Sequence, residues 1–224
     1  MTGLRIGICG GGVGGLAAAI ALRKLGHDPV VFEQASQFLR IGADVNLTPN
    51  AVHAIDRLGV GEILRETAAR PTFRISRTWD TGEETSRLPM SDAAEATYGA
   101  PQLTIHRADL LKAMEGQIPE DALHLGKSVT GIVNDGTQTA IQFADGSSEE
   151  VDVIVGADGI HSAVRNALFG KDDPRFSGIV SYRSVIARED AGDIANLDAF
   201  TKWWGPNPET QIVTFPLTLG KEIF

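Results

Sequence analysis

Three glycines near the N-terminus have the spacing of a phosphate-binding turn. Gly10, Gly12 and Gly15 form the pattern G-x-G-x-x-G. In such a turn the first glycine permits a sharp change of direction after a strand, the second lets the backbone approach a pyrophosphate, and the third lets helix and strand pack closely. The N–H groups and the positive dipole end of the following helix then face the phosphates. The pattern predicts a dinucleotide site.

The segments around these glycines predict the βαβ unit that the motif requires. Residues 4–9 form a short apolar run, which is typical of a buried parallel strand. Residues 16–25 are rich in Ala and Leu and predict a helix that stops at Gly26, and residues 29–32 predict a second strand. A glycine-rich turn in another α/β fold is the weaker alternative, because strand, helix and strand occur in the required order.

A carboxylate stands at the end of the second predicted strand. Glu33 follows Gly15 by 18 residues, where it can accept hydrogen bonds from ribose hydroxyls. A 2′-phosphate would be repelled there, so we expect a ligand with an unphosphorylated ADP-ribose half. These residues leave the choice between FAD and NAD open.

A second motif follows residues 150–156, which predict another buried strand. Asp158, Gly159, Ser162 and Arg165 form the pattern D-G-x-x-S-x-x-R. This stretch resembles the Asp-Gly fingerprint of FAD-dependent aromatic monooxygenases with the p-hydroxybenzoate hydroxylase fold. In that family the aspartate helps to hold the pyrophosphate and ribityl region of the flavin, and the motif is implicated in the encounter with the nicotinamide nucleotide. The resemblance favours FAD, and an NAD-dependent dehydrogenase becomes the weaker alternative.

Three further segments share the resemblance, which covers essentially the whole chain. Residues 32–34 are similar to the adenosine-ribose end of the family's site, residues 40–51 resemble the loop that passes the isoalloxazine, and residues 105–110 resemble a segment whose arginine contacts FAD. The similarity is closest to the salicylate, 3-hydroxybenzoate and 6-hydroxynicotinate hydroxylases. The cofactor-binding residues that it implies are Gly10, Gly12, Val13, Gly14, Gly15, Glu33, Gln34, Arg40, Ala43, Arg107, Val129 and Asp158.

The resemblance also implies a fold. The implied class is α/β, with a Rossmann-like FAD-binding domain of the GR2 type that is interleaved with a mostly antiparallel β-sheet substrate domain. We expect this fold to be C-terminally incomplete. The FAD-binding domain would comprise residues 1–71 and 100–175, and the substrate-binding part residues 72–99 and 176–224.

The implied reaction is hydroxylation of a small phenolic or hydroxylated N-heterocyclic acid. NAD(P)H would reduce FAD, O₂ would add to form a C4a-hydroperoxyflavin, and the protein would position the aromatic ring and exclude water. The implied substrate-site residues are Asn46, Tyr182 and Phe215, the last two on strands that line the pocket. We assign no catalytic residue and no metal site.

The chain departs from the family pattern in three places. Asp44 stands where the family has the second glycine of its G-A-G loop. Asn46 stands where 6-hydroxynicotinate hydroxylases tend to have a histidine, which speaks against that substrate. The family's third motif, a Gly-Asp segment, is missing, and residues 220–224 read as a strand in progress. We therefore expect an N-terminal portion of a longer enzyme, or a truncated product that is a non-catalytic nucleotide-binding remnant.

Further patterns predict local structure. We expect helices over residues 49–70 and 107–115, a strand hairpin over residues 72–90 with its turn at Gly82, and a second hairpin at Gly146. His106 and His161 are interpreted as structural residues, and Arg165 as a brace for the Asp-Gly motif.

The composition excludes several classes of protein. A net charge of −9 without a basic cluster disfavours nucleic-acid binding. The apolar runs are far shorter than the roughly 20 residues of a membrane span, and no secretory signal is visible. A single cysteine, Cys9, excludes an intramolecular disulfide and a Cys-based zinc site. We expect a cytoplasmic protein whose partners are a small aromatic substrate and O₂, and the sequence leaves a homodimer open.

Overall fold

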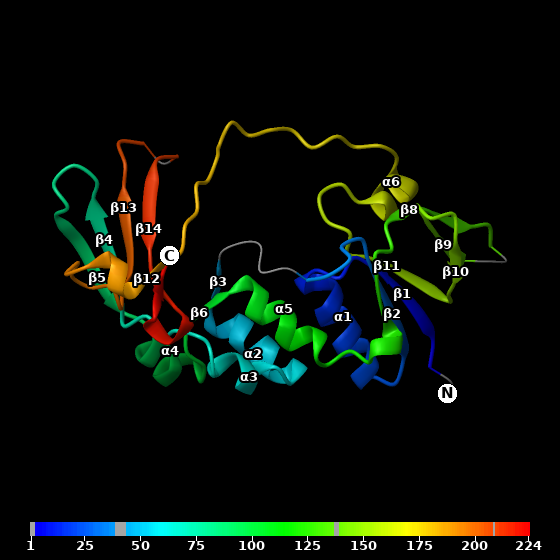
Figure 1. The fold of residues 1–224 in the computed structure, drawn as a ribbon, viewed down its shortest axis with the longest axis horizontal. Coiled ribbons are helices and arrows are strands. Elements are labelled where there is room, and N and C mark those ends of the chain that lie inside the picture. Colours follow the sequence, from blue (N-terminus) through cyan, green and yellow to red (C-terminus); the bar gives the residue numbers. More distant parts are fainter. Residues whose placement is uncertain (1–2, 39–43, 137–138, 208) are drawn as a thin grey trace. The chain divides into compact units, whose positions relative to one another are not determined.

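The computed structural model describes residues 3–38, 44–136, 139–207 and 209–224 (Figure 1). The chain divides into two compact units: unit 1 comprises residues 1–39 and 111–177, and unit 2 comprises residues 40–110 and 178–224. Each unit is assembled from two separate stretches of the chain. The functional division into an FAD-binding and a substrate domain, with the boundaries given above, stays a prediction.

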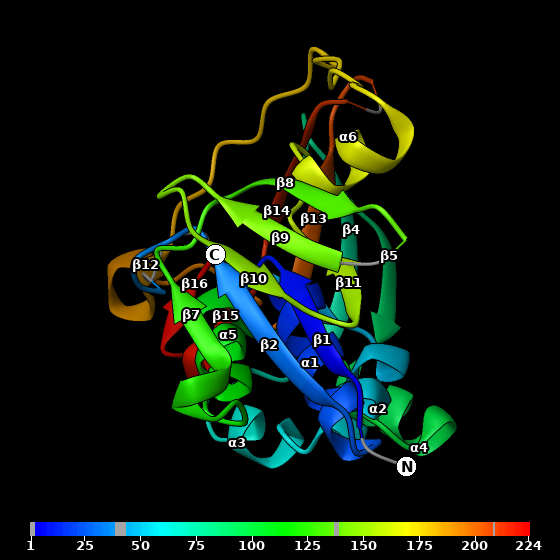
Figure 2. The same ribbon diagram turned by 90° about the vertical axis from the view of Figure 1, so that its right-hand side faces the viewer.

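Unit 1 contains the parallel sheet that the phosphate-binding motif requires. Its strands are β1 (Arg5–Cys9), β2 (Asp28–Glu33), β7 (Leu123–Leu125) and β11 (Val153–Gly156), in the order β11-β1-β2-β7 with all neighbours parallel. Helix α1 (Val13–Lys24) joins β1 to β2 and packs against both strands (Figure 2). This arrangement confirms the predicted βαβ unit. The helix starts earlier than predicted because Gly12 already serves as its N-cap.

A second, antiparallel sheet belongs to the same unit. It consists of β8 (Val129–Asn134), β9 (Thr139–Phe143) and β10 (Ser148–Glu150), and Gly146 has a φ of 83° in the predicted turn between β9 and β10. Side chains from both sheets and from helix α6 (Ala163–Phe169) form one buried core: Cys9, Val30, Phe32, Ile141, Phe143, Val151 and Val164. Burial of these side chains anchors the strands whose ends carry Gly10 and Glu33.

Unit 2 is mainly antiparallel, as the resemblance implies. Its strands are β3 (Asp44–Leu47), β4 (Phe73–Thr78), β5 (Glu84–Pro89), β6 (Leu103–His106), β12 (Ile186–Ala187), β13 (Phe200–Trp204), β14 (Gln211–Thr214), β15 (Pro216–Leu217) and β16 (Glu222–Ile223). They form sheets with the orders β14-β13-β4-β5, β12-β16-β15 and β3-β6. In the first sheet β13 and β4 are parallel and the other neighbours are antiparallel. The β4–β5 hairpin turns at Gly82, with a φ of 70°, as predicted.

The helices correct one prediction. The prediction of one helix over residues 49–70 is wrong, because this segment forms two separate helices, α2 (Pro49–Leu58) and α3 (Gly61–Arg65). Gly59 has a left-handed backbone, with φ 87°, and its N–H donates to the carbonyl of Asp56, which ends the first helix. The remaining helices are α4 (Ser91–Tyr98) and α5 (Arg107–Glu115), of which the second has the predicted bounds. Among the described residues, no helix combines the length and apolar character needed to cross a membrane.

Two predicted strands are shorter than expected. In residues 150–156 the strand β11 starts only at Val153. The N–H of Val151 donates to the carbonyl of Thr139 in β9, and the N–H of Asp152 donates to that of Arg5 at the start of β1. In residues 220–224 the strand β16 has two residues and follows a 3-10 turn (Thr218–Gly220).

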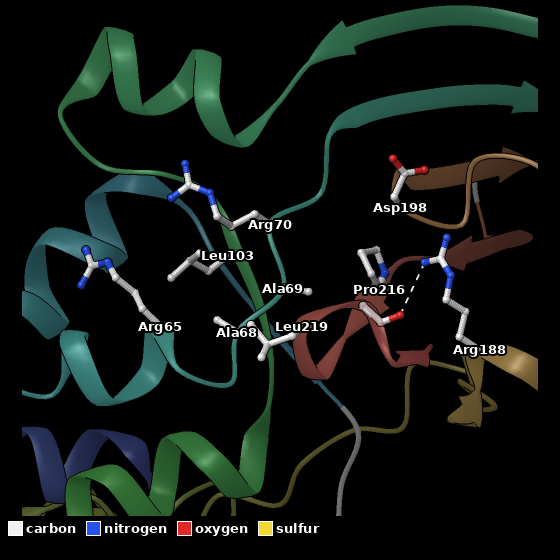
Figure 3. Close-up of a pocket in the computed structure, with 10 residues that line it drawn as sticks. Arg65, Ala68, Ala69, Arg70, Leu103, Arg188, Asp198, Pro216 and Leu219 are labelled. Atoms are coloured by element: carbon white, nitrogen blue, oxygen red, sulfur yellow. Dashed lines mark hydrogen bonds between the residues drawn. The ribbon is translucent and has the colours of Figure 1, made fainter.

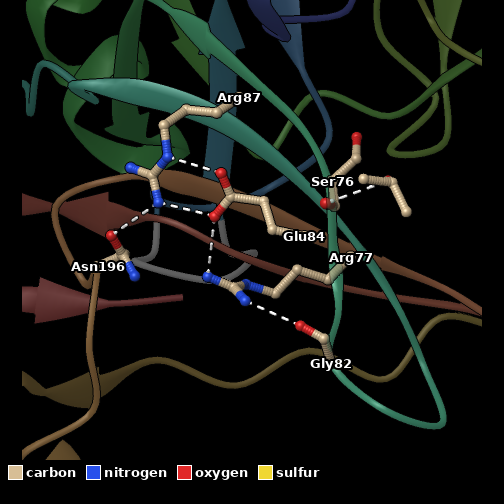
Figure 4. Close-up of polar contacts among 7 residues, drawn as sticks. Ser76, Arg77, Gly82, Glu84, Arg87 and Asn196 are labelled. Atoms are coloured by element: carbon tan, nitrogen blue, oxygen red, sulfur yellow. Dashed lines mark hydrogen bonds and ion pairs between the residues drawn. The ribbon is translucent and has the colours of Figure 1, made fainter.

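The β4–β5 hairpin is braced by a polar network on one face (Figure 4). The Glu84 carboxylate accepts hydrogen bonds from Arg87, at 2.8 Å to each oxygen, and from Arg77 at 3.3 Å. Arg77 also donates to the carbonyl of Gly82, and Arg87 to the side chain of Asn196. The network therefore ties the turn and residue 196 to the hairpin.

The left-handed backbone at Gly59 generates a prediction for the two-helix segment. Substitution Gly59→Ala should lower the free energy of unfolding by about 1 kcal/mol, because a Cβ atom disfavours positive φ. Urea denaturation measures the change. Gly116→Ala is the matched control, since Gly116 does not have a positive φ and a Cβ there meets only ordinary contacts at 3.6 Å. Equal stabilities of the two variants would contradict the assignment.

Candidate dinucleotide site

The glycine-rich turn follows β1, and close backbone contacts leave no room for a side chain at Gly10 or at Gly15. Gly10 has a φ of 107°, its N–H donates to the carbonyl of Phe32 at 2.8 Å, and a Cβ on it would lie 2.3 Å from the carbonyl oxygen of Ala157. A Cβ on Gly15 would lie 1.8 Å from the carbonyl oxygen of Gly10. These distances are the physical reason for the first and third glycines of the motif.

The middle of the turn is open instead. A Cβ on Gly12 or on Gly14 would meet no described atom within 4 Å. Gly12 is the N-cap of α1, Val13 is its first residue, the first turn holds no acidic residue, and no side chain caps it. The first N–H groups of α1 have no partner within the helix, so they and the positive dipole end are available to an anion. The cradle fits a pyrophosphate.

Glu33 braces this turn from the neighbouring strand. Its Oε2 accepts a hydrogen bond from the N–H of Gly11 at 2.7 Å, and its Oε1 accepts one from the N–H of Ala35 at 2.8 Å. Sequence reasoning missed this bracing role, because it depends on the contact between β2 and the turn. Each carboxylate oxygen keeps a lone pair for a ligand hydroxyl. Gln34, the next residue, is exposed.

Asp158 caps helix α6. Its carboxylate accepts hydrogen bonds from the Ser162 hydroxyl at 2.5 Å and from the N–H groups of Ala163 and Val164 at 2.6 and 3.2 Å. The Ser162 hydroxyl in turn accepts from the N–H of Arg165 at 2.9 Å. The D-G-x-x-S pattern is therefore a capping arrangement in this chain.

Two more predicted residues of unit 1 have structural roles. Arg165 donates to the carbonyl of Ile160 at 2.8 Å, which confirms it as a brace of the Asp-Gly motif. Val129 is the first residue of β8 and packs, half-buried, against the core of the unit. Its predicted contact with the adenine side of the cofactor stays a prediction.

The last residue of β1, Cys9, is fully buried beneath the turn. Burial, together with the negative charge of Asp158, raises the pKa of its thiol to about 12. The thiol is protonated at neutral pH, so Cys9 is a packing residue and not a nucleophile.

Unit 2 holds the other predicted cofactor residues. Arg107 is exposed at the first position of α5. Asp44 lies opposite His106 on β3 and β6, and one of its oxygens lies 3.9 Å from the guanidinium of Arg183. Burial raises the pKa of Asp44, and the nearby positive charge of Arg183 opposes that shift. Arg40 and Ala43 lie outside the described residues.

The predicted substrate residues have three different environments. Asn46 is exposed on β3. Tyr182 is 94% exposed and Phe215 is 2% exposed, and neither lies in a strand, so their expected placement on strands is wrong. Phe215 stacks between the rings of Phe200 and Phe224, with centroids 5.1 and 4.6 Å away. Beyond the end of β14 at Thr214, the backbone of Phe215 exchanges hydrogen bonds with that of Phe224, at 3.3 and 2.9 Å.

A family model described as the FAD binding domain matches residues 4–220. The chain belongs to this family. The match confirms the predicted recognition of a flavin-binding fold and favours FAD over the NAD-dependent alternative.

Individual proteins similar to this chain are consistent with the family match. The chain is 35% identical to 6-hydroxynicotinate 3-monooxygenase of Pseudomonas fluorescens, over 89% of the chain and 52% of that protein. It is also 35% identical to 3-hydroxybenzoate 6-hydroxylase 1 of Aquipseudomonas alcaligenes, over 96% and 55%. The crystal structure of Klebsiella pneumoniae HpxO complexed with FAD and uric acid matches with a TM-score of 0.86 and 26% identity, over 100% of the chain and 56% of that one. The chain spans about half the length of these relatives.

The bracing bonds of Glu33 generate a stability prediction. Glu33→Ala should lower the free energy of unfolding by about 1–3 kcal/mol, because two backbone N–H groups lose a charged acceptor. Glu33→Gln keeps one acceptor oxygen and should lose less. Urea denaturation measures both, with Glu83→Ala in the exposed β4–β5 turn as the control. A stability of Glu33→Ala equal to that of the control would show that the bracing bonds contribute nothing.

The raised pKa of Cys9 predicts an inert thiol. Iodoacetamide should fail to alkylate the folded protein from neutral pH to about pH 9, because the thiol stays protonated and buried. Mass spectrometry counts the added groups, and the same reagent in concentrated urea should modify one site per chain. Stoichiometric alkylation of the folded protein would contradict the burial of Cys9.

Proposed function

We propose that this chain is the flavin-binding portion of an FAD-dependent monooxygenase that hydroxylates a small aromatic acid with NAD(P)H and O₂. The observation that carries the proposal is the cradle at the start of α1, where Gly12 and Gly14 leave open space in front of uncapped N–H groups. A pyrophosphate has the size and charge for that place. The family match makes FAD the dinucleotide.

The chain's own residues would hold the cofactor in the following way. The N–H groups from Gly12 to Gly14 would bind the pyrophosphate, and the free lone pairs of Glu33 would accept from the ribose. Arg107, which is exposed and has no ion-pair partner among the described residues, would add a positive charge. FAD, when bound and reduced by NAD(P)H, supplies the reaction with O₂ that protein side chains do not provide.

An aromatic acid is the proposed substrate class. The names of the similar proteins support it, since they include hydroxylases of 6-hydroxynicotinate and 3-hydroxybenzoate. Asn46 and Tyr182 are accessible to such a ligand, whereas Phe215 would act through packing of the Phe200 and Phe224 rings. The absence of a histidine at position 46 favours a phenolic acid over 6-hydroxynicotinate.

Cofactor titration tests the proposal. The protein should bind FAD and quench its fluorescence. Gly12→Val should weaken binding at least about tenfold, because its branched side chain fills the phosphate space, where a Cβ meets no described atom within 4 Å. Gly116→Ala serves as the control and should bind normally. The FAD-loaded protein should oxidise NADH or NADPH faster when 3-hydroxybenzoate or salicylate is added.

Two results would contradict parts of the proposal. Normal FAD binding by Gly12→Val would place the pyrophosphate elsewhere, and stronger binding of NAD than of FAD would favour a dehydrogenase. FAD binding without any aromatic acid that stimulates NAD(P)H oxidation would leave a nucleotide-binding chain without hydroxylase activity.

A further inference from the structure

Two cavities of unit 2 differ in the charge of their walls. The charged cavity, of about 560 Å³, is lined by Arg65, Arg70, Arg188 and Asp198 together with small apolar residues (Figure 3). Carboxylates hold Arg65 and Arg70, whereas Arg188 has no ion-pair partner among the described residues. The second cavity, of about 400 Å³, has no charged residue among the described residues that line it. The two cavities therefore suit ligands of different charge.

The second cavity, which we call the indole cavity, lies on the sheet β14-β13-β4-β5 near the connection from β13 to β14. Trp203 and Ile212 are directly opposite each other on these antiparallel strands, so their side chains are neighbours on one face. Trp79 follows β4 directly, and its N–H donates to the carbonyl of Trp204 at 3.2 Å. Its side chain lines the same cavity. The volume is within the usual range for small-molecule sites.

A glycine leaves room in the indole cavity. Gly205 follows Trp203 by two residues and is part of the lining. Its N–H donates to the carbonyl of Thr210 at 2.8 Å, and a Cβ on it would lie 2.5 Å from that carbonyl oxygen. The close approach of the two backbones therefore requires glycine at this position. Because Gly205 has no side chain, the space beside the indole of Trp203 stays open.

Apolar side chains of the indole cavity remain in contact with water. Trp79 is 59% exposed and Ile212 is 64% exposed. Strand β14 is at the edge of its sheet in the described part of the chain, so no further strand covers Ile212 there. Single exposed apolar residues are common on protein surfaces, but these two line one hollow together with Trp203. A ligand with apolar surface would remove them from water.

The cations nearest to the indole cavity are directed elsewhere. Arg77 lies beside Trp203 on β4 and donates to the carboxylate of Glu84 at 3.3 Å (Figure 4). Lys202 has its Nζ 3.6 Å from the ring centre of Trp204, on the face opposite to Trp203 because side chains alternate along a strand. A carboxylate that entered the indole cavity would lose hydration without gaining a charged partner from the described lining.

The polar groups of the lining are neutral. They are the hydroxyls of Thr210 and Thr214 and the amide of Gln211. The Thr210 hydroxyl donates to the side-chain oxygen of Asn207 at 2.7 Å and keeps its capacity to accept. These groups can bind a hydroxyl, amide or carbonyl group of a ligand without requiring a charge on it.

We infer that the indole cavity binds an uncharged small molecule with a planar, mainly apolar body. The planar body lies against Trp79 and Trp203, whose flat indole rings favour stacking, and Ile212 covers its edge. The inference does not rest on the proposed function. The proposed aromatic acid carries a negative charge that this cavity does not match, and none of the predicted substrate or cofactor residues lines it.

Indole N–H signals in NMR spectra test the inference on the FAD-free protein. The chain has three tryptophans, so ¹⁵N-labelled protein gives one signal for each, which Trp→Phe variants assign. The uncharged probe 2-naphthamide should shift the Trp79 and Trp203 signals saturably and the Trp204 signal much less. The probe 2-naphthoate has the same ring system with a negative charge, and it should bind at least about tenfold more weakly.

Two matched variants locate the site. Trp79→Ala removes an exposed indole of the cavity and should weaken binding of 2-naphthamide at least about tenfold. Trp204→Ala is the control, because it removes a partly exposed indole from the opposite face and should leave the affinity unaltered. Both substitutions are at accessible positions, and the remaining indole signals report whether each variant is folded.

Each other outcome would overturn a defined part of the inference. Equal affinities of wild type and Trp79→Ala would overturn the site. Tighter binding of 2-naphthoate, or of a naphthyl trimethylammonium cation, would overturn the ligand class. Trp79 and Trp203 signals that shift with protein concentration alone, and not with 2-naphthamide, would assign this face to contact between copies of the chain. The titration needs no FAD, so a failure of FAD binding leaves its result unaffected.

Discussion

The candidate dinucleotide site depends on the close approach of helix α1 to the end of strand β1. The carbonyl oxygen of Gly10 occupies the place that a side chain on Gly15 would need, at 1.8 Å from its Cβ position. Because only hydrogen fits there, the helix can begin directly beyond the strand. The first N–H groups of α1 thereby stand at the carboxyl edge of the parallel sheet, where ligands of such folds bind. The rest of unit 1 preserves this contact through its buried core.

Two carboxylates hold the turns at the same edge of the sheet in place. Glu33 ends β2 and Asp158 follows β11, the two strands that flank β1. Each accepts hydrogen bonds from backbone N–H groups of a following or neighbouring turn. These bonds restrict the turns before any ligand arrives, so a ligand meets donors that are already oriented. The acidic residues of the two motifs thus contribute to folding as well as to recognition.

In unit 2, the pairing of charges separates structural arginines from available ones. Arg77 and Arg87 share Glu84, and Arg65 has Asp56 as its partner. Partly exposed pairs of this kind add little stability individually, and their main effect is to orient side chains. Arg188 lacks such a partner among the described residues. Arg188 lines the charged cavity of unit 2, so its N–H donors are available at the edge of that cavity.

Local patterns in the sequence determined much of this protein. The glycine spacing, the apolar runs and the turn residues predicted the βαβ unit, both hairpins and the bounds of α5, because those features depend on neighbours along the chain. The resemblance supplied the family. The break at Gly59 was missed because glycine also occurs inside helices, and its left-handed backbone becomes visible only in the fold.

Tertiary structure alone decided the environments of the site residues. Glu33 as a brace, Phe215 in an aromatic stack and Asp44 beside Arg183 all involve partners that the sequence pattern did not identify, whereas the helix cap at Asp158 was an open alternative from the sequence because its partners are local. Residue type limits what a side chain can bind, but burial and pairing determine which donors, acceptors and charges stay free. Those properties arise when distant segments pack, and they distinguish a structural residue from one that is available to a ligand.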